Sequence, residues 1–557
     1  MIGDGMGWEM ARAAAVSNGS SMYTSGKGKG LNFQKLDGYT LATTYGTIIP
    51  GVDGKFSTGN SALNRSNPIT AKSSVIKDFV FNPTFHQESF AKDGSKKSEN
   101  DGNLVGYNPA LAGINPWTAG SDREYIKQNY PDSAGTATAL YTGVKTYNGA
   151  MGVDIYEQRQ VSILEQAAQA GKSTGLVTSV PISHATPGAA ASFVNQRGKY
   201  DAPKPDLDNI LQQTLTIFKP TVILGGGHPF DLGNATDLGG SYDWRYVTQS
   251  TYEELKSKPD NNSYGYKFIE RGADAVKKLQ ETAKSLNPNQ GDRLLGLYGA
   301  RGQFGNLPFS TANGDYSSTG LGSISVFASA VKNNQVPQIG KKVRPLIQGE
   351  TEEQFIKREI NENPTLADLT SAALTVLGKD KDGFWLMVEG GDIDWAAHDD
   401  NLDNLIGAVN DFDKAVGTTI EWIKQNGGWE KNLLIVTADH DHYLTLNPNF
   451  PKLLAKSGAE NLTYKQHKPV SAGHFWGSDS EIKYGWGTHT NRLVPVYYQG
   501  ASVSLNKYEG KNITFVDNPP GGKLQQLSIP GVKNVIDQSH IYQAMLETIQ
   551  APLSKSK

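Results

Sequence analysis

The 557-residue chain contains no cysteine. This absence excludes disulfide bonds and thiolate metal sites, so any zinc would have to be held by histidine and carboxylate side chains. The sequence also has no apolar run close to the roughly 20 residues that a membrane-spanning helix needs. We therefore expect no membrane span, and we find no secretory signal in this numbering.

An excess of charge of one sign is also lacking. Lysine and arginine (53 residues) nearly balance aspartate and glutamate (56 residues), which leaves a net charge of -3. We therefore expect no global field that would recruit nucleic acid or an anionic membrane, and no nucleic-acid specificity. Glycine is abundant, with 61 residues, and 37% of the chain is hydrophobic, which is typical of a loop-rich globular protein.

Short apolar runs rich in branched residues recur along the chain and are typical of strands buried on both faces. They cover residues 176–180, 221–224, 384–388, 433–437 and 493–498. Helical patterns lie between them, most clearly over residues 402–423 and 161–171. This alternation predicts an α/β fold, a three-layer sandwich with a central, mostly parallel sheet flanked by helices. In such a sheet, functional residues gather beyond the carboxyl ends of the strands.

Two long stretches interrupt the alternation. Residues from about 47 to 130 and from about 228 to 361 are rich in loop-forming residues. Disorder is the alternative interpretation, but aromatic residues such as Trp117 and Trp244 favour folded insertions. We therefore predict a single domain over residues 1–557 that carries two loop-rich insertions.

The first candidate catalytic residue is Ser133, which follows Asp132 and begins a run of small residues with helical character. The ordinary interpretation of such a serine is a helix cap. The free backbone N–H groups and the positive end of a helix dipole would also suit a phosphoryl group attached to this serine. The residues alone leave both interpretations open.

Metal-ligand types follow one of the predicted strands. Glu389 ends the strand, and Asp394 and His398 stand four residues apart after it, so a helix would place both on one face. A solvated acidic turn is the alternative. Carboxylate and imidazole groups together at the end of a strand favour a hydrolytic zinc site.

A second strand is followed directly by Asp439, His440, Asp441 and His442. A polar loop is the alternative, but these residues fall where an α/β sheet places its site. Their alternation predicts that only some of them face inward. We favour Asp439 and His440 and leave His442 out.

Two isolated residues complete the candidate set. Asp4 stands among glycines at the end of a strand fragment, where a capping aspartate in a glycine turn is the ordinary interpretation. His489 lies in a loop before the predicted strand at residues 493–498. Neither residue indicates a site when it is considered alone.

Taken together and in this order, these segments closely resemble the alkaline phosphatase family. The matching motifs cover nearly the whole chain apart from the two insertions, and the motif at Asp132 is the most specific of them. The motifs are MIGDGMG at Met1, DSAGTATALYTGVKTYNGAMGVD at Asp132, HATPGAAASFVNQR at His184, VEGGDID at Val388, TADHDH at Thr437 and GTHTN at Gly487.

The resemblance implies a centre of two zinc ions and one magnesium ion. One zinc ion, which binds the substrate and activates water, would be held by Asp394, His398 and His489. The other zinc ion, which coordinates Ser133, would be held by Asp4, Asp439 and His440. Asp4 would also bridge to the magnesium ion, whose site Glu389 and Thr186 complete.

The resemblance further implies that Arg197 holds the non-bridging phosphate oxygens through two N–H groups. Two positions depart from the best-known bacterial members, which carry an aspartate where this chain has His184 and a lysine where it has Trp395. The first change leaves the identity of the third metal open. The second removes a positive charge beside the phosphate, so we expect weaker binding of the phosphate product.

We therefore predict that the chain hydrolyses small phosphate monoesters at alkaline pH through a phosphoserine intermediate on Ser133, with release of inorganic phosphate. The resemblance also implies a periplasmic or extracellular location and a possible homodimer. A phosphodiesterase or sulfatase-like relative is one alternative, against which Arg197 argues. A non-catalytic phosphate-binding or surface-layer protein is another, against which the complete set of predicted ligands argues.

Overall fold

The computed structural model describes residues 1–50, 72–86, 88–90, 96–99, 102–108, 125–128, 130–202, 207–230, 242–301, 303, 305–317, 344 and 346–550. Much of both predicted insertions, including Trp117, lies outside these residues. Among the described helices, none combines the length and the apolar character that crossing a bilayer requires.

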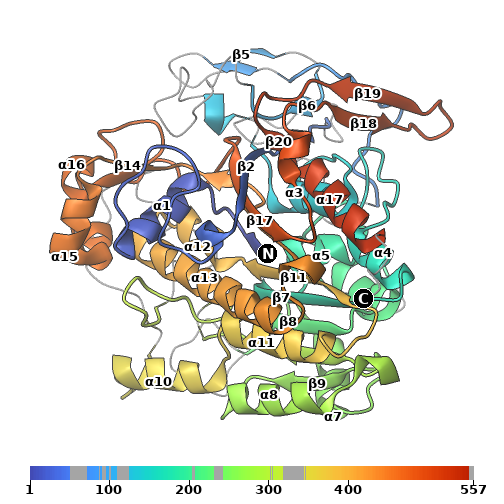
Figure 1. Ribbon diagram of the computed structural model, residues 1–557, viewed down its shortest axis with the longest axis vertical. Helices are drawn as coiled ribbons and strands as arrows, with labels where there is room; N and C mark the ends of the chain where they lie inside the picture. Colours follow the sequence, from blue (N-terminus) through green and yellow to red (C-terminus); the bar gives the residue numbers. More distant parts are fainter. Residues whose placement is uncertain are drawn as a thin grey trace.

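A ten-stranded sheet forms the centre of the described structure (Figure 1). Its order is β20-β2-β17-β12-β1-β11-β7-β8-β10-β9. Neighbouring strands are parallel, except where β17 runs antiparallel to β12 and β2. The strands are β1 (Ile2–Gly3), β2 (Gly38–Thr43), β7 (Ser173–Pro181), β8 (Val222–Gly226), β9 (Lys267–Glu270), β10 (Leu294–Leu297), β11 (Phe384–Gly390), β12 (Leu433–Ala438), β17 (Val494–Gly500) and β20 (Ile536–Asp537).

Each of the five apolar runs identified in the sequence forms a strand of this sheet, namely β7, β8, β11, β12 and β17. In β7 every residue is buried, because helices cover both faces of the central strands and leave no face to solvent. The predicted mostly parallel sheet is therefore confirmed.

Helices form a layer on each side of the sheet. One set packs together around α13, and a second set packs together around α3; members of both sets contact β11. The first set is α1 (Trp8–Ser17), α8 (Ala275–Ser285), α11 (Leu366–Leu377), α12 (Asp392–His398) and α13 (Leu402–Gln425). The second set is α3 (Ser133–Thr142), α4 (Ile163–Gln169), α5 (Ala185–Ala190) and α17 (Gln538–Gln550). The predicted three-layer sandwich is confirmed.

Side-chain caps fix where several of these helices begin. Ser162 and Glu165 form a reciprocal capping box at the start of α4, and Asn401 accepts a hydrogen bond from the Asn404 N–H at the start of α13. Such caps satisfy N–H groups that have no partner within the helix. They therefore fix the residues at which α4 and α13 begin.

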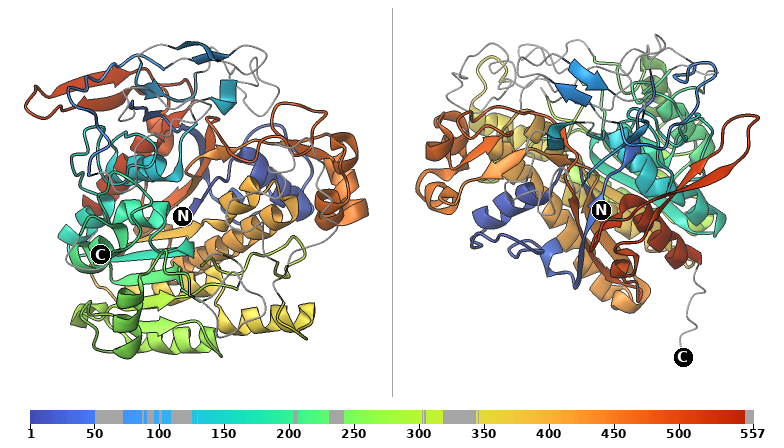
Figure 2. Two further views of the ribbon diagram at one scale, coloured as in Figure 1. Left: turned by 180° about the vertical axis from the view of Figure 1, so that it is seen from behind. Right: turned by 90° about the horizontal axis from the view of Figure 1, so that it is seen from above.

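Smaller elements surround this core. Strands near the first insertion and the hairpin β18–β19 lie at one end of the molecule (Figures 1 and 2), where the Phe81 and Phe515 rings stack at 4.4 Å. The peripheral strands are β3 (Gly46–Thr47), β4 (Glu88–Phe90), β5 (Lys96–Glu99), β6 (Leu104–Val105), β13 (Asp441–His442), β14 (Leu444–Leu446), β15 (His474–Trp476), β16 (His489–Thr490), β18 (Ile513–Asp517) and β19 (Gln525–Ile529). The remaining helices are α6 (Ile210–Gln213), α7 (Gln249–Ser257), α10 (Glu352–Glu362), α14 (Gly428–Lys431), α15 (Phe450–Tyr464) and α16 (Pro469–Ala472).

Candidate metal centre

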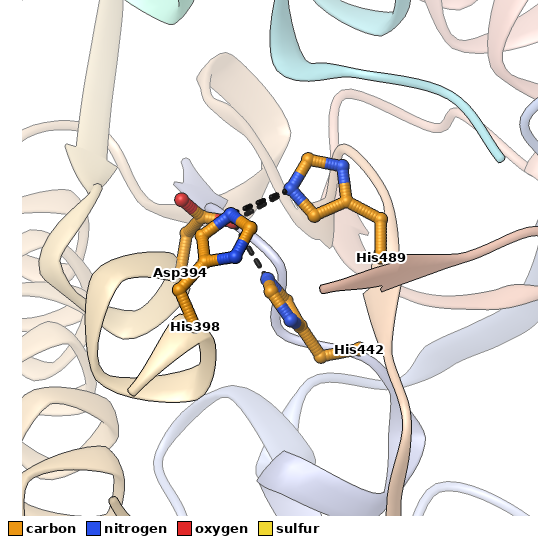
Figure 3. Close-up of side chains that lie close together, drawn as sticks. All are labelled: Asp394, His398, His442 and His489. Carbon is orange, nitrogen blue, oxygen red and sulfur yellow. Dashed lines mark hydrogen bonds and ion pairs between the residues drawn. The ribbon is translucent and has the colours of Figure 1, made fainter. Parts of the chain in front are cut away.

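Four side chains converge beyond the carboxyl ends of β11 and β12 (Figure 3). Asp394, His398, His442 and His489 each offer a ligand atom, and these atoms lie within 4.8 Å of one another. We call this set the Asp394 group. Asp394 Oδ1 is its common point, at 2.7 Å from His442 Nε2, 3.1 Å from His489 Nε2 and 3.4 Å from His398 Nε2.

Local structure explains why these residues meet. Asp394 and His398 lie one turn apart on α12, which is the helical spacing that the sequence indicated. His442 and His489 stand directly opposite each other in the antiparallel pair β13–β16. A helix turn and a short strand pair therefore present two residues each to the same point.

A second set of residues lies beside the first. Asp4, Asp439 and His440 also bring ligand atoms within 4.8 Å of one another, and we call them the Asp4 group. Asp4 follows β1 and Asp439 follows β12, and these two strands are parallel neighbours in the sheet. His440 Nε2 lies 3.2 Å from Asp4 Oδ1 and 3.4 Å from Asp439 Oδ2.

The hydroxyl of Ser133 points into the Asp4 group. Ser133 Oγ lies 3.3 Å from Asp4 Oδ1 and 3.2 Å from His440 Nε2. Ser133 is the first residue of α3, but the cap of that helix is Asp132, whose Oδ1 accepts from the Gly135 N–H at 2.9 Å. The Ser133 side chain is therefore free of the capping role that such a position usually implies.

Oxygen ligands gather on the other side of Asp4. Thr186 Oγ1 donates to Asp4 Oδ2 at 3.3 Å, and Glu389 Oε2 accepts from Thr178 Oγ1. Glu389 is fully buried, and its Oε1 has no hydrogen-bond partner among the described residues. A buried carboxylate oxygen in this state needs a cation or a proton nearby.

Arg197, His184 and Trp395 are the remaining residues that the sequence places beside the predicted ions. Arg197 Nη1 donates to Asp132 Oδ2 at 3.0 Å, and its side chain keeps 23% of its surface exposed. The His184 ring lies 5.9 Å from the Trp395 ring. The indole of Trp395 also packs near Phe309, at 6.3 Å between ring centroids.

The pKa values of the centre reflect the crowding of buried carboxylates. Burial raises the pKa of Glu389 and that of Asp439 to about 7. Burial also raises the pKa of Asp4 well above its usual value, and Asp394 and Glu389 raise it further. These shifts mean that several neighbouring anions are unfavourable without a compensating positive charge.

Asp394 behaves in the opposite way. Burial alone would raise its pKa, but His398, His442 and His489 lower it well below the usual value. Burial lowers the pKa values of His398 and His489, so both rings are favoured in the neutral form that binds metals. The donor types therefore fit divalent cations: imidazole and carboxylate groups suit zinc, and the hard oxygens of Glu389 and Thr186 suit magnesium.

All of the residues that the sequence predicts as catalytic residues, metal ligands or their neighbours lie in or beside this centre. One further residue joins them. The sequence pattern excludes His442 from the predicted ligands, yet His442 belongs to the Asp394 group. Asp441 is the member that turns away, because its carboxylate pairs with Arg492 at 2.6 Å. The pairing of β13 with β16 places His442 inward, and this long-range contact leaves no signal in the local sequence.

Comparisons with known proteins identify the family to which the chain is similar. A family model described as alkaline phosphatase matches residues 99–509. Alkaline phosphatase H of Pseudomonas aeruginosa is 31% identical over 385 residues, which cover 67% of this chain and 69% of that protein. The alkaline phosphatase of Escherichia coli is 32% identical over 323 residues, which cover 56% of this chain and 58% of that protein.

A solved structure of low sequence identity to this chain has the same fold. The crystal structure of a cold-active alkaline phosphatase from the psychrophile Shewanella sp. aligns with 99% of both chains at a TM-score of 0.51 and 19% identity. The family match covers most of the chain, and its members are hydrolases of phosphate monoesters. The chain therefore belongs to the alkaline phosphatase family, as its motifs predicted.

Proposed function

We propose that the chain hydrolyses phosphate monoesters through a phosphoserine on Ser133, at a centre of two zinc ions and one magnesium ion. The observation that carries this proposal is the position of Ser133 Oγ, within 3.3 Å of both Asp4 Oδ1 and His440 Nε2. His440 Nε2 also faces the Asp439 carboxylate at 3.4 Å. This environment suits a metal ligand better than the general base of a serine–histidine pair.

The two groups suggest where each ion would bind. Asp394, His398 and His489 would hold one zinc ion, with His442 beside Asp394, and the Asp4 group would hold the other. Asp4, Glu389 and Thr186 would hold magnesium, although the neighbouring His184 leaves the identity of this ion open. When bound, the cations supply Lewis acidity, which makes the serine hydroxyl and a water molecule nucleophilic and neutralises the leaving oxygen.

The residues of the chain supply the positioning. Ser133 Oγ loses its proton and attacks phosphorus in line, and the bond between phosphorus and the ester oxygen breaks, so that the ester oxygen takes up a proton and leaves as the alcohol. The N–H groups at the start of α3 face the negative charge of the phosphoryl group. Arg197, held by Asp132, binds the non-bridging oxygens of the phosphoryl group. A water molecule then attacks the phosphoserine, which releases phosphate and restores the hydroxyl.

Ester preference tests this proposal. A nitrophenyl phosphate monoester is expected to be hydrolysed at least ~10²-fold faster than the corresponding bis-ester, because a terminal phosphate offers the oxygens that Arg197 binds. In Arg197→Ala, kcat/KM for the monoester is expected to fall by roughly 10- to 100-fold, with a smaller loss for the bis-ester. Arg159→Ala is the control, because Arg159 pairs with Glu165 away from the centre. A preference for the bis-ester would identify the chain as a diesterase.

Zinc binding to the Asp4 group is expected to weaken as the pH falls through about 7. Because burial raises the pKa of Asp439 to about 7 from 3.8, Asp439 in the metal-free protein holds a proton between these values, and zinc must displace it. Above the raised pKa this competition disappears. Calorimetric titrations at about pH 6 and about pH 8, each in two buffers, measure the affinity and the protons released. Equal affinity at both pH values would contradict the prediction.

Family membership also suggests a periplasmic or extracellular location and a homodimer, and we include both in the proposal. Fractionation of cells and light scattering of the purified protein test them separately from the chemistry.

A further inference from the structure

The motif TYNGA contains a buried asparagine to which the proposed mechanism gives no role. Asn148 is 5% exposed, and its side chain binds the backbone on both sides of Pro131. Its Oδ1 accepts from the Asp132 N–H at 3.0 Å, and its Nδ2 donates to the Tyr130 carbonyl at 2.9 Å. One carboxamide therefore fixes the two residues that flank Pro131.

The carbonyl of Pro131 in turn binds a residue of the Asp394 group. His489 Nδ1 lies 2.8 Å from Pro131 O. Because a carbonyl can only accept, this contact puts the proton on Nδ1 and turns Nε2 toward Asp394 Oδ1, at 3.1 Å. Outer hydrogen bonds of this kind fix the tautomer and the orientation of metal-binding histidines.

Asp132, the residue after Pro131, reaches the other half of the centre. Its carboxylate caps α3 through Gly135, accepts from the Gly149 N–H at 3.1 Å and binds Arg197. Asn148 and Gly149 therefore hold Asp132 from the same side, and Asp132 holds both the start of the Ser133 helix and the guanidinium group.

Packing leaves the Pro131 peptide few other orientations. The Tyr130 ring meets the His489 ring edge-on at 5.5 Å, and it meets Trp486 edge-on at 6.0 Å. Proline fixes its own φ and has no N–H to donate. The direction of its carbonyl therefore depends on the backbone of Tyr130 and Asp132, which the Asn148 carboxamide holds.

We propose that Asn148 is a positioning residue with two effects. It sets the orientation of the Pro131 carbonyl, which aligns His489 with Asp394. It also holds Asp132, which in turn holds Arg197 in position to bind phosphate. This inference rests on the proposed function of the centre. According to this inference, the Asn148 side chain positions both the proposed zinc ligand His489 and the phosphate-binding residue Arg197.

Two substitutions test the inference. In Asn148→Ala both backbone contacts are lost. In Asn148→Asp the size and the acceptor are kept, but the side chain cannot donate to the Tyr130 carbonyl and places a negative charge beside it. For both variants, zinc binding at the Asp394 group, which contains His489, is expected to weaken by roughly 10- to 100-fold. The inhibition constant for inorganic phosphate is expected to rise as well.

Asn103→Ala is the matched control. Asn103 is 2% exposed, and it makes the same two kinds of contact, to the Asn82 N–H at 2.7 Å and the Ile48 carbonyl at 2.9 Å, outside the centre. It is expected to lose thermal stability but to keep the zinc affinity and the phosphate inhibition constant of the unsubstituted protein.

The measurement is a competition titration of the metal-free proteins with zinc and a chelating dye, together with phosphate inhibition of the loaded enzymes. If the unsubstituted protein binds no zinc, the proposed function fails. If it binds zinc and the Asn148 variants bind both ions with unchanged affinity, the positioning role is overturned. If Asn148→Ala does not fold, Asn148→Asp decides the question.

Discussion

Replacing Ser133 with alanine is expected to lower kcat/KM for a phosphate monoester by at least ~10³-fold while the protein keeps its metal ions. Ser133 Oγ is the hydroxyl that faces Asp4 and His440, so its loss removes the proposed nucleophile. The carboxylate and imidazole groups remain in place. Steady-state kinetics and elemental analysis of the same preparation measure both quantities.

Ser192→Ala is the control for this substitution. Ser192 is as buried as Ser133, at 2% exposure, but its hydroxyl donates to the carbonyl of Gly188, four residues earlier in the chain. This variant is expected to keep its activity. If Ser133→Ala also kept its turnover, Ser133 would have no covalent role.

The second large effect is expected for Asp394→Asn. The Asp394 carboxylate is the common partner of three histidine rings, and the substitution keeps its shape but removes its charge. We expect zinc affinity at the Asp394 group to fall by at least ~10²-fold and turnover to fall on the order of 10³-fold. Titration of the metal-free protein separates the binding loss from the catalytic loss.

Asp413→Asn provides the comparison, because Asp413 is also a buried carboxylate, at 7% exposure. Its oxygens accept from the backbone N–H groups of Asn32 and Phe33. It is expected to lose stability without losing zinc. Full zinc affinity in Asp394→Asn would show that this carboxylate is not a ligand.

The position of the centre follows from the sheet. Asp4, Glu389 and Asp439 come from three adjacent parallel strands, with Ile2 level with Glu389 on one side and Thr437 on the other. The carboxyl ends of parallel strands meet at one edge. Residues far apart in the sequence therefore reach the same place through the pairing of strands.

Much of this arrangement could be predicted from the residues. The buried strands are short apolar runs. Glu389 is the last residue but one of β11, and Asp439 directly follows β12. Asp394 and His398 have helical spacing, and α12 is a helix. These features depend on local patterns, which the sequence displays directly.

Long-range contacts could not be predicted in the same way. His442 joins the centre only because β13 pairs with β16, and Asn148 binds the backbone of Asp132 and Tyr130, which precede it by 16 and 18 residues. The antiparallel direction of β17 also depends on the path of the chain between strands. No local periodicity encodes such contacts, so only the folded arrangement reveals them.

The most direct test of the account is to trap the covalent intermediate. The metal-loaded enzyme is mixed with a phosphate monoester, quenched in acid and digested, and its peptides are analysed by mass spectrometry. The account predicts one phosphoryl group on the peptide that contains Ser133, and none after the metals have been removed with a chelator. Turnover without phosphorylated Ser133, or with the phosphoryl group on another residue, would contradict it.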